Sequence, residues 1–84
     1  MQQSLQDKYR SAYGDYRLQI GRTIHRHTVS GNALLSVMHA GEWLSQAQEC
    51  LIARELEAFA SRMHHACRCL KEAGIDIPLP DILK

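Results

Sequence analysis

The sequence predicts an all-α fold of two or three antiparallel helices, followed by an extended C-terminal strap that contains proline. Two observations lead to this prediction in a chain of 84 residues. Apolar residues recur at steps of three and four over most of the chain, which indicates amphipathic helices rather than strands. Prolines near the end then exclude further helix there. A chain of this length is enough for a single domain, residues 1–84.

The first predicted helix covers residues 4–28, and Ser4 is its expected N-cap. Gly14 and Gly21 interrupt it on a second, smaller face, each at a cost of about 1 kcal/mol relative to alanine. That face lets another helix approach closely, or else the two glycines have no role and the helix merely tolerates them. The main apolar stripe holds Leu5, Tyr9, Ala12, Tyr13, Tyr16, Ile20 and Ile24.

The stretch Thr28-Val-Ser-Gly-Asn32 is the first break in the pattern. Ser30 or Asn32 can cap a short helix over residues 32–40, and Gly41 then stands where a helix C-terminus favours a left-handed residue. The alternative is a kink at the first break, which would join residues 4–40 into one bent arm.

A long helix is predicted over residues 42–73, between two glycines. Glu42 in the first turn and Lys71 in the last suit the helix dipole, and Gly74 is a typical C-terminal residue. The apolar register changes around residues 48–52, which allows a kink or a tight helix–helix turn. Because neither glycine nor proline stands there, we expect one helix.

The last ten residues cannot continue a helix, because Pro78 and Pro80 impose extended geometry. Large apolar residues are too frequent for a solvated tail: Ile75, Ile77, Leu79, Ile82 and Leu83. We therefore expect a strap that packs across the helices of its own chain or of a second copy.

The net charge of +1 gives no reason to expect that the protein binds nucleic acid or a membrane surface. It is nevertheless uneven: residues 1–30 hold five basic and two acidic side chains, and residues 31–60 hold one and four. An antiparallel pairing of these two segments would be electrostatically complementary.

No apolar run is long enough to span a bilayer, and the N-terminal residues lack the apolar core of a signal peptide. A cytoplasmic location is therefore expected. The three cysteines, Cys50, Cys67 and Cys69, are then expected to be reduced thiols, and their odd number argues against a disulfide framework.

Four residues are candidate metal ligands: His64, His65, Cys67 and Cys69. His64 and Cys67 share one helix face, and His65 and Cys69 share another. Because the two pairs point in different directions, one helix cannot close a four-ligand site with them. We expect no metal and no cofactor. We also expect that the protein is not an enzyme, since all the cysteines lie inside a predicted helix and no catalytic motif is present.

A short basic run, Arg22, His25, Arg26 and His27, ends the first helix, where cations suit the dipole. It could instead contact phosphates as the edge of a DNA-binding dimer. The run lacks the spacing of a recognition helix that reads bases.

Tyr9, Tyr13 and Tyr16 form a ladder on the main stripe of the first helix. Tyrosine is common at interfaces because its ring buries area while its hydroxyl finds a polar partner. Core packing is the alternative. The interface interpretation predicts a partner-binding groove between the first and the long helix, edged by Tyr9, Tyr13, Tyr16, Trp43, Phe59 and Met63.

The segment Ala40-Gly-Glu-Trp43, preceded by Leu34-Leu-Ser-Val-Met38, resembles the helix–Gly–Trp–helix hairpin of FliT-type flagellar export chaperones. It is similar also to the hairpin of PerC-like and ANR-like bacterial virulence regulators, although Cys50 stands near their second tryptophan. A single tetratricopeptide-like hairpin fits as well. These resemblances imply a small bacterial helical protein that binds other proteins.

The sequence therefore predicts a small non-enzymatic regulator or chaperone-like adaptor, such as an anti-activator. Its partner would be another protein, either a regulator or an export substrate, and its apolar stripe predicts a homodimer. A DNA-binding transcription regulator is the first alternative, and a metal-binding sensor is the second.

Overall fold

The computed structural model describes residues 4–26 and 31–84 of the chain. It contains three α-helices and a short 3-10 turn: α1 (Leu5–Arg26), α2 (Asn32–Ile52), α3 (Leu56–Glu72) and η1 (Asp81–Leu83). No strand occurs within these residues, so the predicted all-α class is confirmed. None of the helices in the described part of the chain is long and apolar enough to cross a membrane.

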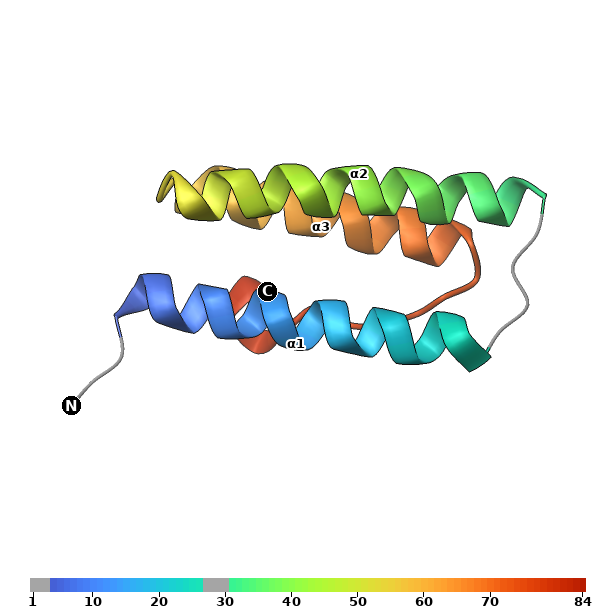
Figure 1. Ribbon diagram of the computed structural model, residues 1–84, viewed down its shortest axis with the longest axis horizontal. Coiled ribbons are helices and arrows are strands. Elements are labelled where there is room, and N and C mark those ends of the chain that lie inside the picture. Colours follow the sequence, from blue (N-terminus) through green and yellow to red (C-terminus); the bar gives the residue numbers. More distant parts are fainter. Residues whose placement is uncertain (1–3, 27–30) are drawn as a thin grey trace.

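The helices α2 and α3 pair side by side as an antiparallel hairpin, and α1 runs antiparallel to α2 below it (Figure 1). After α3 the chain turns back along α1, and η1 lies beside that helix. One core joins all these parts. Its buried residues come from every helix and from the C-terminal segment: Ala12, Tyr16, Ile20, Ala40, Leu44, Ala47, Leu51, Phe59, Met63, Ala66, Leu70, Ile75, Ile77, Leu79 and Leu83.

The helix α2 passes through Gly41 without a break, so the predicted helices over residues 32–40 and 42–73 are wrong. Gly41 does not adopt a positive φ. An internal glycine costs only about 1 kcal/mol relative to alanine. The buried stripe of α2 continues on both sides of it, through Ala40 and Leu44, and favours helix over that whole length.

The chain reverses between α2 and α3 in a Schellman motif centred on Arg54. The Glu55 amide donates to the Cys50 carbonyl at 2.8 Å, and the Arg54 amide donates to the Leu51 carbonyl at 3.1 Å. This motif needs a left-handed residue, and Arg54 supplies it with a φ of 62°. The change of apolar register around residues 48–52 allowed such a turn, but one helix was predicted because glycine, the usual residue at such a position, is absent.

The same motif ends α3, where the glycine is present. The Ile75 amide donates to the Leu70 carbonyl and the Gly74 amide to the Lys71 carbonyl, both at 2.9 Å. Gly74 has a φ of 81°. Ile75 and Leu70 are both buried, and an apolar contact between these two positions usually accompanies the motif. The prediction of a helix end at Gly74 is confirmed.

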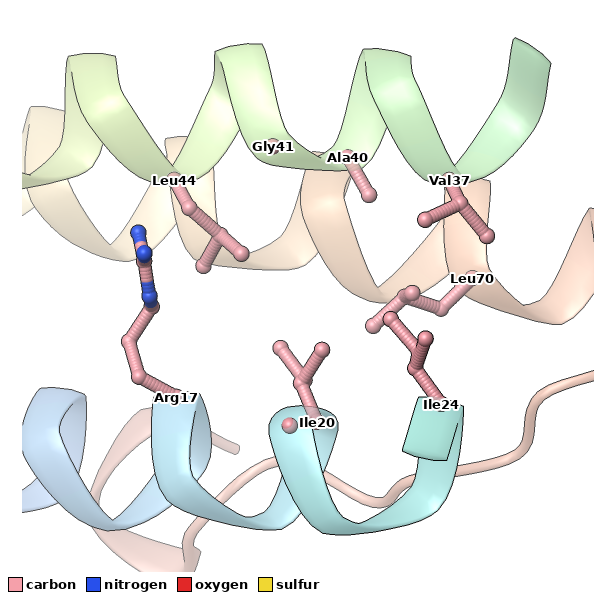
Figure 2. A pocket seen from close by; sticks show the side chains of 9 residues that line it. Arg17, Ile20, Ile24, Val37, Ala40, Gly41, Leu44 and Leu70 are labelled. Atoms are coloured by element: carbon pink, nitrogen blue, oxygen red, sulfur yellow. The ribbon is translucent and has the colours of Figure 1, made fainter. Parts of the chain in front are cut away.

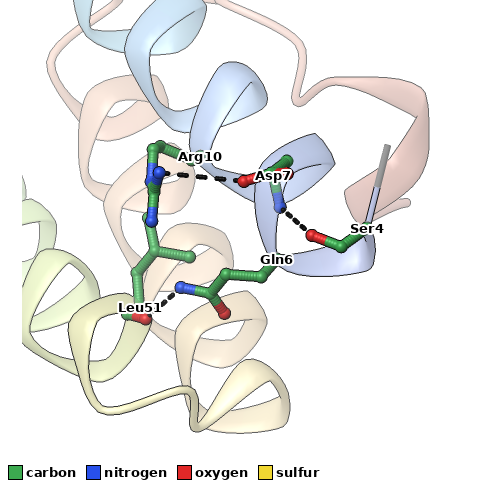
Figure 3. Close-up of polar contacts among 5 residues, drawn as sticks. All are labelled: Ser4, Gln6, Asp7, Arg10 and Leu51. Atoms are coloured by element: carbon green, nitrogen blue, oxygen red, sulfur yellow. Dashed lines mark hydrogen bonds and ion pairs between the residues drawn. The ribbon is translucent and has the colours of Figure 1, made fainter. Parts of the chain in front are cut away.

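Ser4 caps the start of α1, as predicted, and its Oγ accepts a hydrogen bond from the Asp7 amide at 3.1 Å (Figure 3). The N-cap of α2 is Gly31, which makes no side-chain cap. Asn32 is instead the first residue of that helix, and the other predicted cap, Ser30, lies outside the described residues. The prediction that the first helix reaches residue 28 also falls partly outside them.

The N-terminal half of α1 is tied to the hairpin by polar and aromatic contacts. The Gln6 side-chain amide donates to the Leu51 carbonyl at 2.6 Å (Figure 3), and the Tyr13 hydroxyl donates to the Leu44 carbonyl at 3.2 Å. The rings of Tyr9 and Tyr13 lie 5.5 and 6.1 Å from the ring of Phe59. Among the described residues, 17–26 donate no hydrogen bond to the hairpin and accept none from it.

Backbone carbonyls of the C-terminal segment accept hydrogen bonds from α1 and pair with side chains of α3. The Tyr16 hydroxyl donates to the Ile77 carbonyl at 2.9 Å, and the Cys67 thiol approaches the same oxygen at 3.6 Å. His64 Nε2 lies 2.7 Å from the Leu83 carbonyl. The segment therefore joins α1 to α3 on the side away from α2.

We expect Arg54→Gly to raise the free energy of unfolding by about 0.5–1 kcal/mol. A side chain in the left-handed region costs about 1–2 kcal/mol, which exceeds the roughly 0.5–1 kcal/mol of extra unfolded-state entropy that glycine brings. Urea denaturation at an unchanged m-value measures the difference.

Arg54→Ala is the control, because it removes the same side chain and keeps the strained Cβ. Gly74→Ala is the reciprocal change, and we expect it to lower the stability by about 1 kcal/mol. A glycine variant of Arg54 no more stable than its alanine variant would contradict this account of the turn.

Candidate partner-binding groove

An open, mostly apolar groove lies between the C-terminal half of α1 and the N-terminal half of α2, with Leu70 of α3 at its base (Figure 2). Its volume is about 200 Å³. We call it the α1–α2 groove. The residues that line it are Arg17, Ile20, Gly21, Ile24, Val37, Ala40, Gly41, Leu44 and Leu70.

One glycine on each wall helps to keep this groove open. Gly21 lies on α1 and Gly41 on α2, and a Cβ added at either would meet no heavy atom within 4 Å. Among the described residues, the hydrogen bonds between the two helices lie outside this half of α1, where Gln6 donates to Leu51 and Tyr13 donates to Leu44. Gly21 belongs to the smaller face that the sequence indicated on the first helix, whereas Gly41 was interpreted as a helix end.

Exposed apolar side chains also occur on α2 near the groove residues. Leu34, Leu35 and Met38 are 46%, 53% and 55% exposed. Leu34, Met38 and Gly41 are spaced by four and three residues, so they lie on one stripe of the helix. An exposed apolar surface beside an apolar groove marks an interaction site more often than scattered single residues do.

The charged residue among those that line the groove is Arg17, and no carboxylate lines it. No Asp or Glu occurs between Asp15 and Glu42, whereas Arg17, Arg22 and Arg26 do. The ion pairs within residues 4–26 and 31–84 are Asp7–Arg10 and Asp81–Lys84, so these three arginines have no carboxylate partner there. The predicted charge pairing of residues 1–30 with 31–60 therefore forms no ion pair in the described structure.

Arg17 stands at one end of the groove with its guanidinium directed toward α2 (Figure 2). Its Nη1 donates a hydrogen bond to the Tyr13 hydroxyl at 3.2 Å, and its Cζ lies 5.9 Å from the centre of that ring. These contacts hold the guanidinium at the groove. The side chain is otherwise exposed.

The six residues predicted to bind a partner do not form one accessible surface. Tyr16, Phe59 and Met63 are fully buried, and Tyr9 and Tyr13 are half-buried against Phe59. These five residues join α1 to the hairpin and take up the space in which the groove was predicted. Their role toward a partner stays a prediction.

Trp43, the sixth, lies apart from the other five. Its ring stacks on His65 with the centroids 4.4 Å apart, and the guanidinium carbon of Arg62 lies 5.6 Å from the ring centre. This half-buried cluster therefore belongs to the surface of the hairpin.

The groove residues that sequence reasoning missed are Ile20, Ile24, Val37, Leu44 and Leu70. A signal for some of them was present. The segment Leu34-Leu-Ser-Val-Met38 carries more apolar residues than one helix face can bury, and this excess could have indicated an exposed apolar surface on α2.

The basic run lies at the end of α1, where Arg22, His25 and Arg26 are exposed. His27 lies outside the described residues. Exposure makes these side chains available to a charged partner of any class, so they remain candidates for nucleic-acid contact.

The four candidate metal ligands divide between two places. His64 and Cys67 contact the C-terminal segment, and His65 stacks on Trp43. Burial raises the pKa of the Cys69 thiol and Glu72 adds to the shift, which disfavours the thiolate that binds metals. Within the described residues no three His, Cys, Asp or Glu side chains gather as ligands.

A second, polar hollow of about 220 Å³ lies on α3. Its lining is His64, Cys67, Arg68 and Lys71. The two cations occupy the last turns of the helix, where they stabilise its dipole.

Comparisons of the chain with protein-family models, with curated proteins and with solved structures found no match. The candidate function consequently rests on the geometry of the chain itself.

We expect the stability to fall as the pH rises above about 10, and Tyr16→Phe to make this fall less steep. Burial raises the pKa of the Tyr16 hydroxyl, and Cys67 and Asp76 raise it further. Above the ordinary tyrosine pKa the unfolded chain loses this proton while the folded chain keeps it, so folding becomes less favourable.

Urea denaturation of both proteins between pH 8 and pH 11 measures this effect. Near pH 8 the phenylalanine variant should be about 1 kcal/mol less stable, since it lacks the hydrogen bond to Ile77. Parallel stability profiles of the two proteins over this range would contradict the predicted role of Tyr16.

Proposed function

We propose that the protein is a small, non-enzymatic protein-binding adaptor that holds an amphipathic helix of a larger partner in the α1–α2 groove. The observation that carries this proposal is the open apolar groove between two helices, with the exposed Leu34 and Met38 on the adjoining stripe of α2. Helix-in-groove binding uses apolar anchors at spacings of three, four and seven residues.

The size of the groove favours side chains over a small molecule. Its volume of about 200 Å³ lies below the roughly 300–1,000 Å³ of ligand pockets. Along α1 it runs from Arg17 to Ile24, a rise of about 10.5 Å. Anchors seven residues apart on a partner helix span the same length, so two turns of helix fit it.

The C-terminal segment acts in this proposal as a strap that holds α1 in place. It buries Ile77 and Leu79, and it accepts the Tyr16 hydrogen bond on the side of α1 away from the groove. The strap therefore holds α1 at Tyr16, next to the start of the groove wall. A regulator or an export substrate with an exposed amphipathic helix would be such a partner.

The test of this proposal blocks the groove with Gly21→Leu and uses Gly14→Leu as the matched control. Both glycines are exposed, both lie in α1, and a Cβ at either meets nothing within 4 Å. Leucine favours helix over glycine by up to about 1 kcal/mol, so both variants should stay folded. Only Gly21 lines the groove.

The measurement is a pull-down from an extract of the source organism treated with nuclease, using wild type and both variants. We expect one stoichiometric protein that binds wild type and Gly14→Leu and is lost, or weakened at least tenfold, with Gly21→Leu. Equal capture by all three baits would contradict the proposal. So would recovery of a second copy alone, which indicates a homodimer, or of nucleic acid alone, which indicates the DNA-binding alternative.

A further inference from the structure

We propose that the helix held in the groove is acidic: its apolar face fills the groove, and a carboxylate at its edge pairs with Arg17. This inference rests on the proposed function and states the chemistry of the partner. It follows from the charge that lines the groove rather than from its shape.

Arg17 places positive charge in the α1 wall of the groove, and it has no carboxylate partner in the described structure. Arg22 and Arg26 lie on the opposite face of α1, since the groove residues of that helix are Arg17, Ile20, Gly21 and Ile24. The Debye length is about 8 Å at physiological ionic strength, so a helix lying in the groove feels the charge of Arg17. A basic partner helix would be repelled there, and like charges brought together cost several kcal/mol.

The position of Arg17 suits one carboxylate. Guanidinium has five N–H donors, and the structure uses one of them toward Tyr13. The remaining donors can form a bidentate pair with a carboxylate, the strongest common geometry for such an ion pair. The contacts of Arg17 with the Tyr13 ring and hydroxyl hold it in place, so little ordering entropy opposes this pair.

An apolar floor beside the arginine excludes a phosphate backbone as the main occupant. Duplex DNA offers a nearly continuous row of phosphates and no apolar face. Charged phosphates would then cover apolar side chains with which they make no favourable contact: Ile20, Ile24 and Val37. An amphipathic helix instead satisfies the apolar floor and the arginine together.

The first experiment selects among displayed helical peptides of 20 residues. Their anchor positions i, i+3, i+4 and i+7 vary among Leu, Met and Phe, and their flanking positions vary among Glu, Gln and Lys. The full-length protein is the bait, with Gly21→Leu and Gly14→Leu as in the test of function. We expect the selection to enrich Glu at the flanks, in peptides that Gly14→Leu retains and Gly21→Leu loses.

The outcomes separate the two proposals. Enrichment of Gln or Lys, in peptides that only Gly21→Leu loses, would overturn the acidic partner and leave the adaptor function standing. No peptide sensitive to Gly21→Leu would overturn the helix-in-groove function, and the acidic partner with it.

The second experiment is a double-mutant cycle between Arg17 and each flanking Glu of the best selected peptide. We expect Arg17→Gln to weaken binding of the acidic peptide about tenfold. The same substitution should change binding less than twofold once the paired Glu of the peptide is replaced by Gln. Arg10→Gln is the matched control, because Arg10 lies on the same stripe of α1, two turns from Arg17, and already pairs with Asp7.

Equal effects of Arg17→Gln and Arg10→Gln, or no coupling with any Glu of the peptide, would overturn the ion pair. A labelled random-sequence DNA duplex that binds the protein at 150 mM salt and displaces the peptide would overturn the choice of a protein helix as occupant.

Discussion

Within the described residues, hydrogen bonds join the helix α1 to the rest of the molecule along its first half alone, and the other features depend on this asymmetry. In its first half Gln6 and Tyr13 bond to carbonyls of α2, the tyrosine rings pack on Phe59, and Tyr16 reaches Ile77. These contacts combine buried apolar area with hydrogen bonds that satisfy buried carbonyls. Past Tyr16 the helix continues for nearly three more turns with apolar contacts alone.

A groove follows directly from this arrangement. The first half of α1 is fixed, and its second half runs alongside α2. The space between the two helices stays open there, since Gly21 and Gly41 have no side chains to fill it. A chain of 84 residues buries a modest share of its surface, and none of the elements that the structure describes covers this gap. Arg17 of α1 lines the same gap, and the exposed Leu34 and Met38 lie on the adjoining stripe of α2, which is why binding of a further helix explains all three features together.

The sequence predicted the helical class, the cap at Ser4 and the end of α3 at Gly74, because each depends on a local pattern with a known residue preference. It failed at Gly41 and Arg54 for one common reason. Glycine permits a helix end but does not require one, whereas burial on both sides of Gly41 favours continuation. The left-handed residue at Arg54 is selected by the pairing of α2 with α3, a tertiary contact that no local pattern records.

The candidate site was harder to predict than the fold. The tyrosine ladder has the same sequence pattern whether it faces a partner or the core. In the structure Tyr16 is buried and bonds to Ile77, whereas Tyr9 and Tyr13 are half-buried against Phe59. The groove itself combines residues from three helices, and its position depends on where α1 is fastened. The signals that remained visible were partial: an excess of apolar residues before Gly41 and a small-residue face at Gly21.

Native-state amide hydrogen exchange along α1 tests the central claim most directly. If the helix is fastened only at its first half, amides of residues 18–26 should exchange through local openings of lower free energy than those of residues 9–17. For the amides of residues 9–17, the free energy of the opening that permits exchange should approach that of global unfolding. Equal protection along the whole helix would contradict the account, because it would mean that the second half is held as firmly as the first and that no groove opens beside it.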